Sequence, residues 1–238
     1  MTTDIKQVLS AAVSRITDTP VVTDEQIAEV AAKRREEERR RRVNECWREW
    51  SQAVGERYWQ CSIANFHAVE EAAKSARTAV DEYCRSIVES VKSGAGLLLF
   101  GPKGTGKDHL LSHASMCAIA HGIRVLWKNG ADLFGDVRDS IGADGGERQF
   151  LVQFIRAPVL YISDPLPPAG KLTEFQAATL FRILDGRYRA RRPTWVSVNA
   201  TGRVDLEERL GAQNADRLRD GAVAIYCNWP SYRKPSRS

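Results

Sequence analysis

Long apolar runs are absent from this sequence of 238 residues, in which uninterrupted hydrophobic stretches reach only a handful of residues. A membrane-spanning helix needs about 20 consecutive apolar residues, so we expect no membrane partner. The N-terminal stretch MTTDIKQVLS contains an acid and a base within six residues and lacks the apolar segment of a signal peptide. We therefore expect a cytoplasmic protein.

Paired cysteine motifs are also absent. The five cysteines, at positions 46, 61, 84, 117 and 227, are odd in number and widely spaced, and none belongs to a C-x-x-C pair. This pattern favours reduced thiols and argues against a disulfide framework or a zinc site. With 43% hydrophobic and 27% charged residues, the composition is that of an ordinary globular chain.

The net charge of +5 is unevenly distributed. Residues 1–60 and 61–174 are nearly neutral, whereas residues 175–238 contain 12 basic and 6 acidic residues. A localised basic excess is the electrostatic pattern expected for a nucleic-acid or phosphate partner. An arginine-rich surface that faces only solvent explains the charge equally well.

Residues 1–60 are predicted to form a separable helical arm. The stretch from Thr23 to Gln26 matches a capping box, and neither glycine nor proline follows until Gly55. The mixed charge run KRREEERRRR (33–42) favours an exposed helix face with Glu–Arg pairs four residues apart over a nucleic-acid-binding arm.

An apolar and aromatic stripe follows the charge run at helical spacing. Its members are Val43, Trp47, Trp50, Val54 and Tyr58. Such a stripe usually packs on its own domain. Its position on an otherwise charged arm makes binding to a partner protein an equally good interpretation.

Residues 61–238 are predicted to form an α/β domain. A helix over 66–93, ending at Gly94, precedes an alternation of short apolar runs and helical segments. The apolar runs at 96–100, 123–127, 159–162, 194–198 and 223–227 are continuous, which indicates strands buried on both faces. We expect a five-stranded parallel sheet covered by helices, with the glycine-rich GADGGE (142–147) as a loop.

The first of these strands runs directly into GPKGTGKD and then into a helix. In this context the glycines let backbone N–H groups surround a phosphate, and Lys107 reaches the phosphate oxygens. The alternative is a glycine-rich turn in which the lysine binds no phosphate. The predicted ATP-binding residues are Gly101, Pro102, Lys103, Gly104, Thr105, Gly106, Lys107, Asp108 and His109.

Two further strand ends are expected at the same site. Asp164 follows VLYIS and would bind Mg²⁺ directly or through water, and Asn199 would sense the γ-phosphate. Many ATPases carry a glutamate immediately after this aspartate that polarises the attacking water. Pro165 stands there instead, and proline cannot accept a proton. We predict ATP binding with weak or absent hydrolysis, with Lys107, Asp164 and Asn199 in the catalytic positions.

Asp108 occupies the place of the Ser or Thr that usually holds Mg²⁺. Two unit charges of like sign about 4 Å apart repel by roughly 4 kcal/mol at an effective dielectric of 20. A Mg²⁺ ion between carboxylate and phosphate reverses the sign of the interaction. We therefore predict that Asp108 and Asp164 share the metal.

From about Cys61 to Arg233 the sequence resembles the DnaC/IstB-like family of AAA+ ATPases. The resemblance rests on CSIANF, GPKGTGKDHL, YISDP, LFRILDGRYRARRPTWVSVNAT, LGAQNADRLR and NWPSYR, in this order. It implies an AAA+ P-loop NTPase core of the ASCE type at 61–238. Only about 40 residues follow the strand that ends at Asn199, too few for the helical lid of typical AAA+ proteins, and the helicase loaders of the family lack that lid.

The resemblance also implies partners. Loaders of this family grip a hexameric replicative helicase through an N-terminal helical arm and self-assemble with ATP as a spiral around single-stranded DNA. By this resemblance Trp47, Trp50 and Tyr58 would contact the helicase. Lys128 and Arg138 would contact DNA, although ordinary surface charge explains either residue as well.

Arg217 is implied as the arginine that reaches the ATP of a neighbouring copy. Family members usually have a second arginine where Gln213 stands, so part of the contact with the neighbour's ATP stays undecided.

The function implied is a loader that places a helicase on single-stranded DNA. Two others remain open: an IstB-like transposition helper on duplex DNA, and a non-hydrolysing adaptor that ATP merely orders.

Overall fold

The computed structural model describes residues 23–142 and 146–233. The chain divides into two units, Met1–Arg41 and Arg42–Ser238. Helix α2 (Asp24–Val54) contributes to both units. The compact unit therefore begins upstream of the boundary expected at residue 60, because the last turns of α2 pack with the α/β core.

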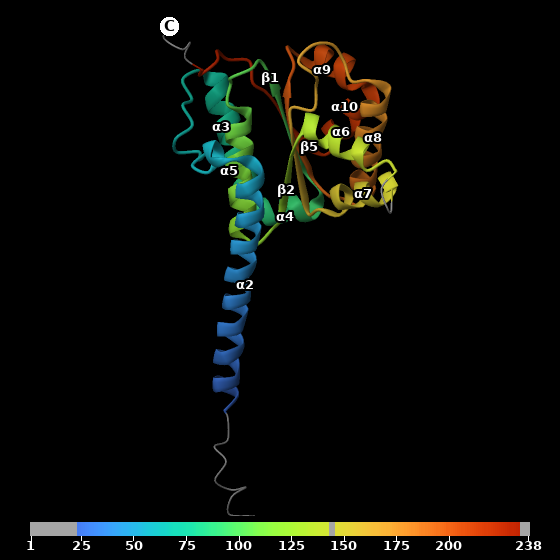
Figure 1. The fold of residues 1–238 in the computed structure, drawn as a ribbon. Coiled ribbons are helices and arrows are strands. Elements are labelled where there is room, and N and C mark those ends of the chain that lie inside the picture. The colour runs from blue at the N-terminus through green and yellow to red at the C-terminus, as the bar shows by residue number, and fades with distance from the viewer. Residues whose placement is uncertain (1–22, 143–145, 234–238) are drawn as a thin grey trace, which may run out of the picture. The chain divides into compact units, whose positions relative to one another are not determined.

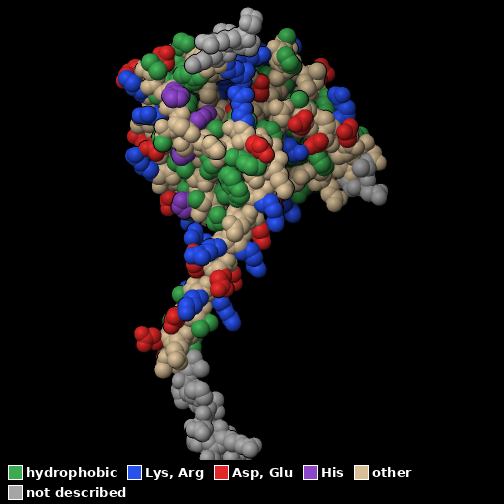
Figure 2. Space-filling view, turned by 60° about the vertical axis from the view of Figure 1, so that its left-hand side comes forward, with side chains coloured by type: hydrophobic (Ala, Val, Ile, Leu, Met, Phe, Trp, Pro, Cys, Tyr) green, Lys and Arg blue, Asp and Glu red, His purple; other side chains and the backbone are tan. Residues whose placement is uncertain are grey.

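In the first unit, α2 begins with the expected capping box. The Thr23 amide donates to the Gln26 side chain (3.1 Å), and the Gln26 amide donates to Thr23 Oγ1 (3.3 Å). The charge run forms pairs along the helix, in which Arg39 and Arg40 both bind Glu36 at 2.8 and 2.9 Å. Acidic and basic side chains are interspersed along this segment (Figure 2), so the solvated helix face predicted from the sequence is confirmed.

In the second unit, the aromatic stripe packs on the chain's own core. Trp50 is 1% exposed and Val54 is buried, while Val43, Trp47 and Tyr58 are partly buried against the same cluster. The aromatic surface predicted for a partner is thus largely occupied. Helix α2 ends before Gly55, whose φ of 86° suits glycine.

In the described part of the chain, five parallel strands form one sheet in the order β2-β3-β4-β1-β5. Their bounds are β1 (Gly96–Gly101), β2 (Val125–Asn129), β3 (Val159–Ser163), β4 (Thr194–Asn199) and β5 (Ala222–Tyr226). The register pairs Gly101 with Asn199, and Ser163 with both Asn129 and Ser197. Polar residues of three strands, β2, β3 and β4, therefore line up toward the carboxyl edge of the sheet, beside Gly101 at the end of β1.

Helices cover both faces of the sheet (Figure 1). One face carries α3 (Glu71–Arg85), α4 (Ile87–Ser93), α5 (Lys107–Ala120) and the last turns of α2. The other face carries α6 (Gly130–Asp139), α7 (Gly146–Arg156), α8 (Glu174–Arg189), α9 (Arg203–Leu210) and α10 (Ala212–Arg219). Each face has its own buried apolar cluster, so the predicted α/β fold is confirmed.

Some elements differ from the sequence-based expectation. The single helix expected over 66–93 is two helices, because the backbone at Ser86 leaves helical geometry, and Gly94 caps the second with a φ of 86°. The stretch 142–147 was expected to be a loop, but Gly146 already begins α7, and residues 143–145 lie outside the described residues. In the described ranges no helix combines the length and apolar character needed to cross a bilayer.

Candidate nucleotide-binding site

The phosphate loop lies between β1 and α5, as predicted. Lys107 is the first residue of α5 and is 4% exposed. Its ammonium donates hydrogen bonds to the carbonyls of Gly101 (3.0 Å) and Pro102 (2.7 Å), and burial lowers its pKa. A cation held against its own loop at a helix N-terminus is suited to binding phosphate.

The segment that follows β5 packs against the phosphate loop through Trp229 and Tyr232. The Tyr232 amide donates to the Gly104 carbonyl (2.9 Å), and the Trp229 indole donates to the Thr105 carbonyl (3.0 Å). Gly106 has a φ of 85°, and a Cβ there would lie 2.7 Å from the ring of Phe66. Glycine at this position thus meets both a backbone and a packing requirement, and the motifs CSIANF and NWPSYR act as supports for the loop.

Asp164 and Asn199 meet at the neighbouring strand ends. The Asn199 side chain donates to the Asp164 carboxylate, and its backbone amide donates to Asp164 Oδ1 at 3.4 Å. Burial raises the pKa of Asp164, and the hydrogen bonds from Asn199 offset part of that rise. Asp164 has a φ of 49°, a left-handed conformation that aspartate tolerates better than most residues.

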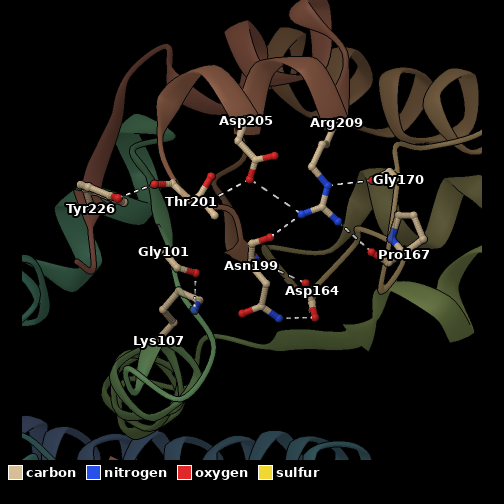
Figure 3. A network of polar contacts seen from close by, with 10 residues as sticks. All are labelled: Gly101, Lys107, Asp164, Pro167, Gly170, Asn199, Thr201, Asp205, Arg209 and Tyr226. Atoms are coloured by element: carbon tan, nitrogen blue, oxygen red, sulfur yellow. Dashed lines mark hydrogen bonds and ion pairs between the residues drawn. The ribbon is translucent and has the colours of Figure 1, made fainter. Parts of the chain in front are cut away.

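Arg209, which sequence reasoning missed, fixes the geometry around this pair (Figure 3). Its guanidinium donates to the carbonyls of Asn199 (2.9 Å), Pro167 (2.8 Å) and Gly170 (2.7 Å). The arginine thereby ties the loop that follows Asp164 to the strand end that carries Asn199. Its only sequence signal is its place just before the motif LGAQNADRLR.

Asp108 is anchored to the sheet. Its Oδ1 accepts hydrogen bonds from the hydroxyls of Tyr161 (2.7 Å), Ser163 (2.9 Å) and Ser197 (2.5 Å). Burial and the Asp108 carboxylate raise the pKa of Tyr161, which stays a hydrogen-bond donor. Oδ1 thus binds three hydroxyl donors, and Oδ2 accepts none of the hydrogen bonds found in the described ranges.

Pro165 packs tightly against the start of α6. A Cβ on Gly130 would come within 2.3 Å of the Pro165 Cα. The position next to Asp164 is therefore filled by a buried proline ring, which neither accepts a proton nor orients water. Weak hydrolysis stays a prediction.

A cleft of about 840 Å³ joins these elements. Its lining includes Lys103, Gly104, Gly106, Lys107, Asp108, His109, Asp164 and Asn199 from the predicted set, together with Arg57, Phe66 and Arg233. Gly101, Pro102 and Thr105 lie behind the lining, where their oxygens contact Lys107. His109 is held by the Ser62 carbonyl at 2.9 Å, and burial lowers its pKa.

Three predicted residues lie outside this cleft. Arg217 lines a separate pocket at the amino ends of β1, β4 and β5, where it stacks on Tyr188 at 4.5 Å and lies 3.6 Å from Asp185. Lys128 is paired with Asp136 at 2.6 Å, and Arg138 lies over the Phe175 ring. None of the three therefore belongs to the chain's own nucleotide site.

The donor set of the cleft fits a magnesium ion. Asp108, Asp164, Asn199 and Ser163 all line it, and Mg²⁺ prefers carboxylate and other oxygen ligands. Asp164, and Asp108 through Oδ2, are the residues that would hold it. A bound ion would neutralise charge between the two carboxylates and the phosphates.

Comparison with known proteins identifies the family. Residues 68–237 match the family described as IstB-like ATP binding protein. The replicative helicase loader DnaC of Buchnera aphidicola subsp. Baizongia pistaciae is 28% identical over 186 residues, which cover 76% of this chain and 72% of the relative. An insertion-sequence ATP-binding protein of Sinorhizobium fredii is 29% identical over 151 residues, which cover 60% of this chain and 48% of that protein.

Solved structures give the same answer for the fold. The crystal structure of the DnaC helicase loader aligns with a TM-score of 0.64 and 21% identity, covering 72% of this chain and 99% of that one. The match to the family extends over most of the chain and includes the phosphate loop, Asp164 and Asn199. The chain belongs to the IstB-like ATP-binding protein family, and its core has the α/β fold of the DnaC helicase loader structure.

Proposed function

We propose that the protein is an ATP-controlled loader that binds a hexameric replicative helicase and helps to place it on single-stranded DNA. The observation that carries the proposal is the nucleotide cleft in which Lys107, Asp164 and Asn199 converge. Loader relatives that cover about three quarters of the chain support it.

In this proposal ATP acts mainly as a switch. Lys107 and the loop amides bind the phosphates, and Asp164 and Asp108 hold the metal. Because Pro165 replaces the water-activating glutamate, we expect turnover below about 1 s⁻¹, the lower end of ordinary catalysed phosphoryl transfer.

ATP should bind much more weakly in excess EDTA, because the carboxylates then face the phosphates without a cation. Equal affinity with and without EDTA would contradict the shared metal.

The helicase contact is assigned to the first unit. Trp50 is buried in the core, which leaves the exposed apolar residues of α2 upstream as the contact surface. Ile27 and Val30 are 55% and 52% exposed and lie three residues apart, so they share one helix face.

Self-assembly and DNA binding form the rest of the proposal. Arg217 lies away from its own nucleotide cleft, which supports a role toward the ATP of a neighbouring copy. Lys128 and Arg138 remain the proposed DNA contacts. The ion pair of Lys128 with Asp136 reduces its free charge, so Arg138 is expected to contribute more to phosphate binding.

An IstB-like helper that acts on duplex DNA is the second candidate. The insertion-sequence relative favours it specifically. The discriminating experiment is co-purification of the full chain with the replicative helicase of its host, with and without ATP, using Lys107→Ala as the nucleotide-free control. We expect the wild type to co-purify with the helicase in a yield that depends on ATP. The yield with Lys107→Ala should not depend on ATP. Absence of helicase together with retention of duplex DNA would favour the transposition helper, and equal yields with Lys107→Ala would favour a passive adaptor.

A further inference from the structure

Three metal-ligating side chains converge away from the nucleotide cleft. They are Cys84 on α3 and His113 and Cys117 on α5, and their ligand atoms all lie within 4.8 Å of one another. Within residues 23–142 and 146–233 this is the one such group of three or more His, Cys, Asp or Glu side chains. None of the three lines the nucleotide cleft.

Helix packing creates this cluster. His113 and Cys117 are four residues apart on α5, so they project from the same helix face. Cys84 belongs to the last turn of α3, which packs on α5. The sequence argued against zinc because it lacks C-x-x-C pairs, but two packed helices bring together ligands that no short motif could reveal.

The geometry suits a tetrahedral zinc ion. Zinc bonds of about 2.3 Å to sulfur and about 2.1 Å to nitrogen, at a tetrahedral angle, place the two ligand atoms about 3.6 Å apart. Cys117 Sγ and His113 Nε2 are separated by 3.5 Å. This pair already has the spacing that one shared ion requires.

The surroundings suit a site with one open position. Cys84 is 9% exposed, whereas His113 and Cys117 are half-buried. Because two of the three residues are only half-buried, water can reach the site and serve as a fourth ligand beside the three protein ligands.

We propose that Cys84, His113 and Cys117 bind one Zn²⁺ ion, with a water molecule completing the coordination. Thiolate and imidazole ligands favour zinc over magnesium, whose ligands are oxygens, so this site differs in chemistry from the one in the ATP cleft. Since α5 begins at Lys107, the ion would brace the helix of the phosphate loop against α3.

The test is zinc binding by the reduced full-length chain. Metal is first removed with a chelator, one to three equivalents of Zn²⁺ are added, and retained zinc is measured after gel filtration. We expect one equivalent per chain. Cys84→Ser, His113→Ala and Cys117→Ser should each weaken binding by at least about tenfold, because each removes one of three protein ligands. Cys46→Ser is the matched control, since Cys46 is buried on α2 and bonds the Gly122 carbonyl.

A spectroscopic measurement keeps the test independent of folding. Co²⁺ bound to the wild type should give thiolate-to-cobalt charge-transfer absorption, which each Cys variant should weaken and Zn²⁺ should abolish by displacing the cobalt. Failure of the reduced wild type to bind zinc would overturn the proposal, as would retention by the three variants at the wild-type level. Recovery of a Cys84–Cys117 disulfide from a chain that takes up no zinc after reduction would identify a redox pair instead.

Discussion

At the residue scale, Asp108 differs from the usual serine or threonine because its carboxylate is bonded into the sheet. The hydroxyls of Tyr161, Ser163 and Ser197 all point to one of its oxygens. The residue thus has a structural role in addition to any part in holding a metal. The structural role uses Oδ1, whereas the proposed metal would bind Oδ2, so the two can be separated by substitution.

Replacing Asp108 by alanine should lower the free energy of unfolding by about 1–3 kcal/mol, because the hydroxyls of three buried residues lose their acceptor. Asp108→Asn retains an acceptor oxygen and should be less destabilising while still weakening Mg²⁺-dependent ATP binding. Chemical denaturation and ATP titration measure the two effects. The control is Asp139→Ala, an exposed carboxylate at the end of α6. Equal stability of the wild type and Asp108→Ala would refute the structural role.

Arg209 is a positioning residue in this account. Arg209→Ala should weaken ATP binding and destabilise the loop after Asp164, since three carbonyls lose their shared donor. Arg209→Lys should recover only part of the loss, because an ammonium cannot reproduce the guanidinium fork. Hydrogen exchange over residues 165–172 is the readout that distinguishes it from general destabilisation. Arg203→Ala, an exposed arginine on the same helix, should leave exchange there unchanged.

At the scale of elements, α2 combines two kinds of surface in one helix. Its last turns complete the core around Trp50, whereas Ile27 and Val30 in the first unit are exposed. The two ends are therefore expected to respond differently to substitution.

Trp50→Ala should destabilise the compact unit by about 3–5 kcal/mol, the usual cost of removing a large buried aromatic side chain. The double variant Ile27→Ala with Val30→Ala should leave the melting temperature unchanged and reduce helicase capture in a pull-down. Glu37→Ala on the exposed part of the same helix is the control. Loss of helicase capture only in Trp50→Ala would point to the core as the contact.

The sequence was sufficient to predict the five strands, the phosphate loop and the start of α2, because continuous apolar runs, glycine spacing and capping residues are local signals. The sequence did not decide whether the aromatic stripe that contains Trp50 packs on its own core or on a partner, since helical spacing alone does not say which surface covers it. The sequence also did not reveal the role of Arg209 or the cluster of Cys84, His113 and Cys117, for a related reason. Their partners are far away in the chain, and only packing brings them together.

At the scale of the whole molecule, copies of the chain that assemble as proposed would act on one another's ATP. Arg217 is stacked on Tyr188 and near Asp185 in a pocket separate from its own cleft. A half-buried arginine that lies outside its own cleft fits the proposed role toward the ATP of a neighbouring copy.

Arg217→Ala should therefore keep wild-type ATP affinity in the monomer and lose ATP-dependent assembly on single-stranded DNA. Sedimentation velocity with ATP and an oligonucleotide measures the assembly. Arg182→Ala, an exposed arginine on α8 paired with Glu147, is the control. A monomer with weakened ATP binding would show that Arg217 acts on its own nucleotide.

The central claim is tested most directly by loading the host's replicative helicase onto closed circles of single-stranded DNA, which offer no free end. We predict that the chain with ATP increases the number of circles that carry a helicase, and that Lys107→Ala lowers this yield by at least about tenfold through loss of phosphate binding. A yield that is the same with and without the chain would contradict the account.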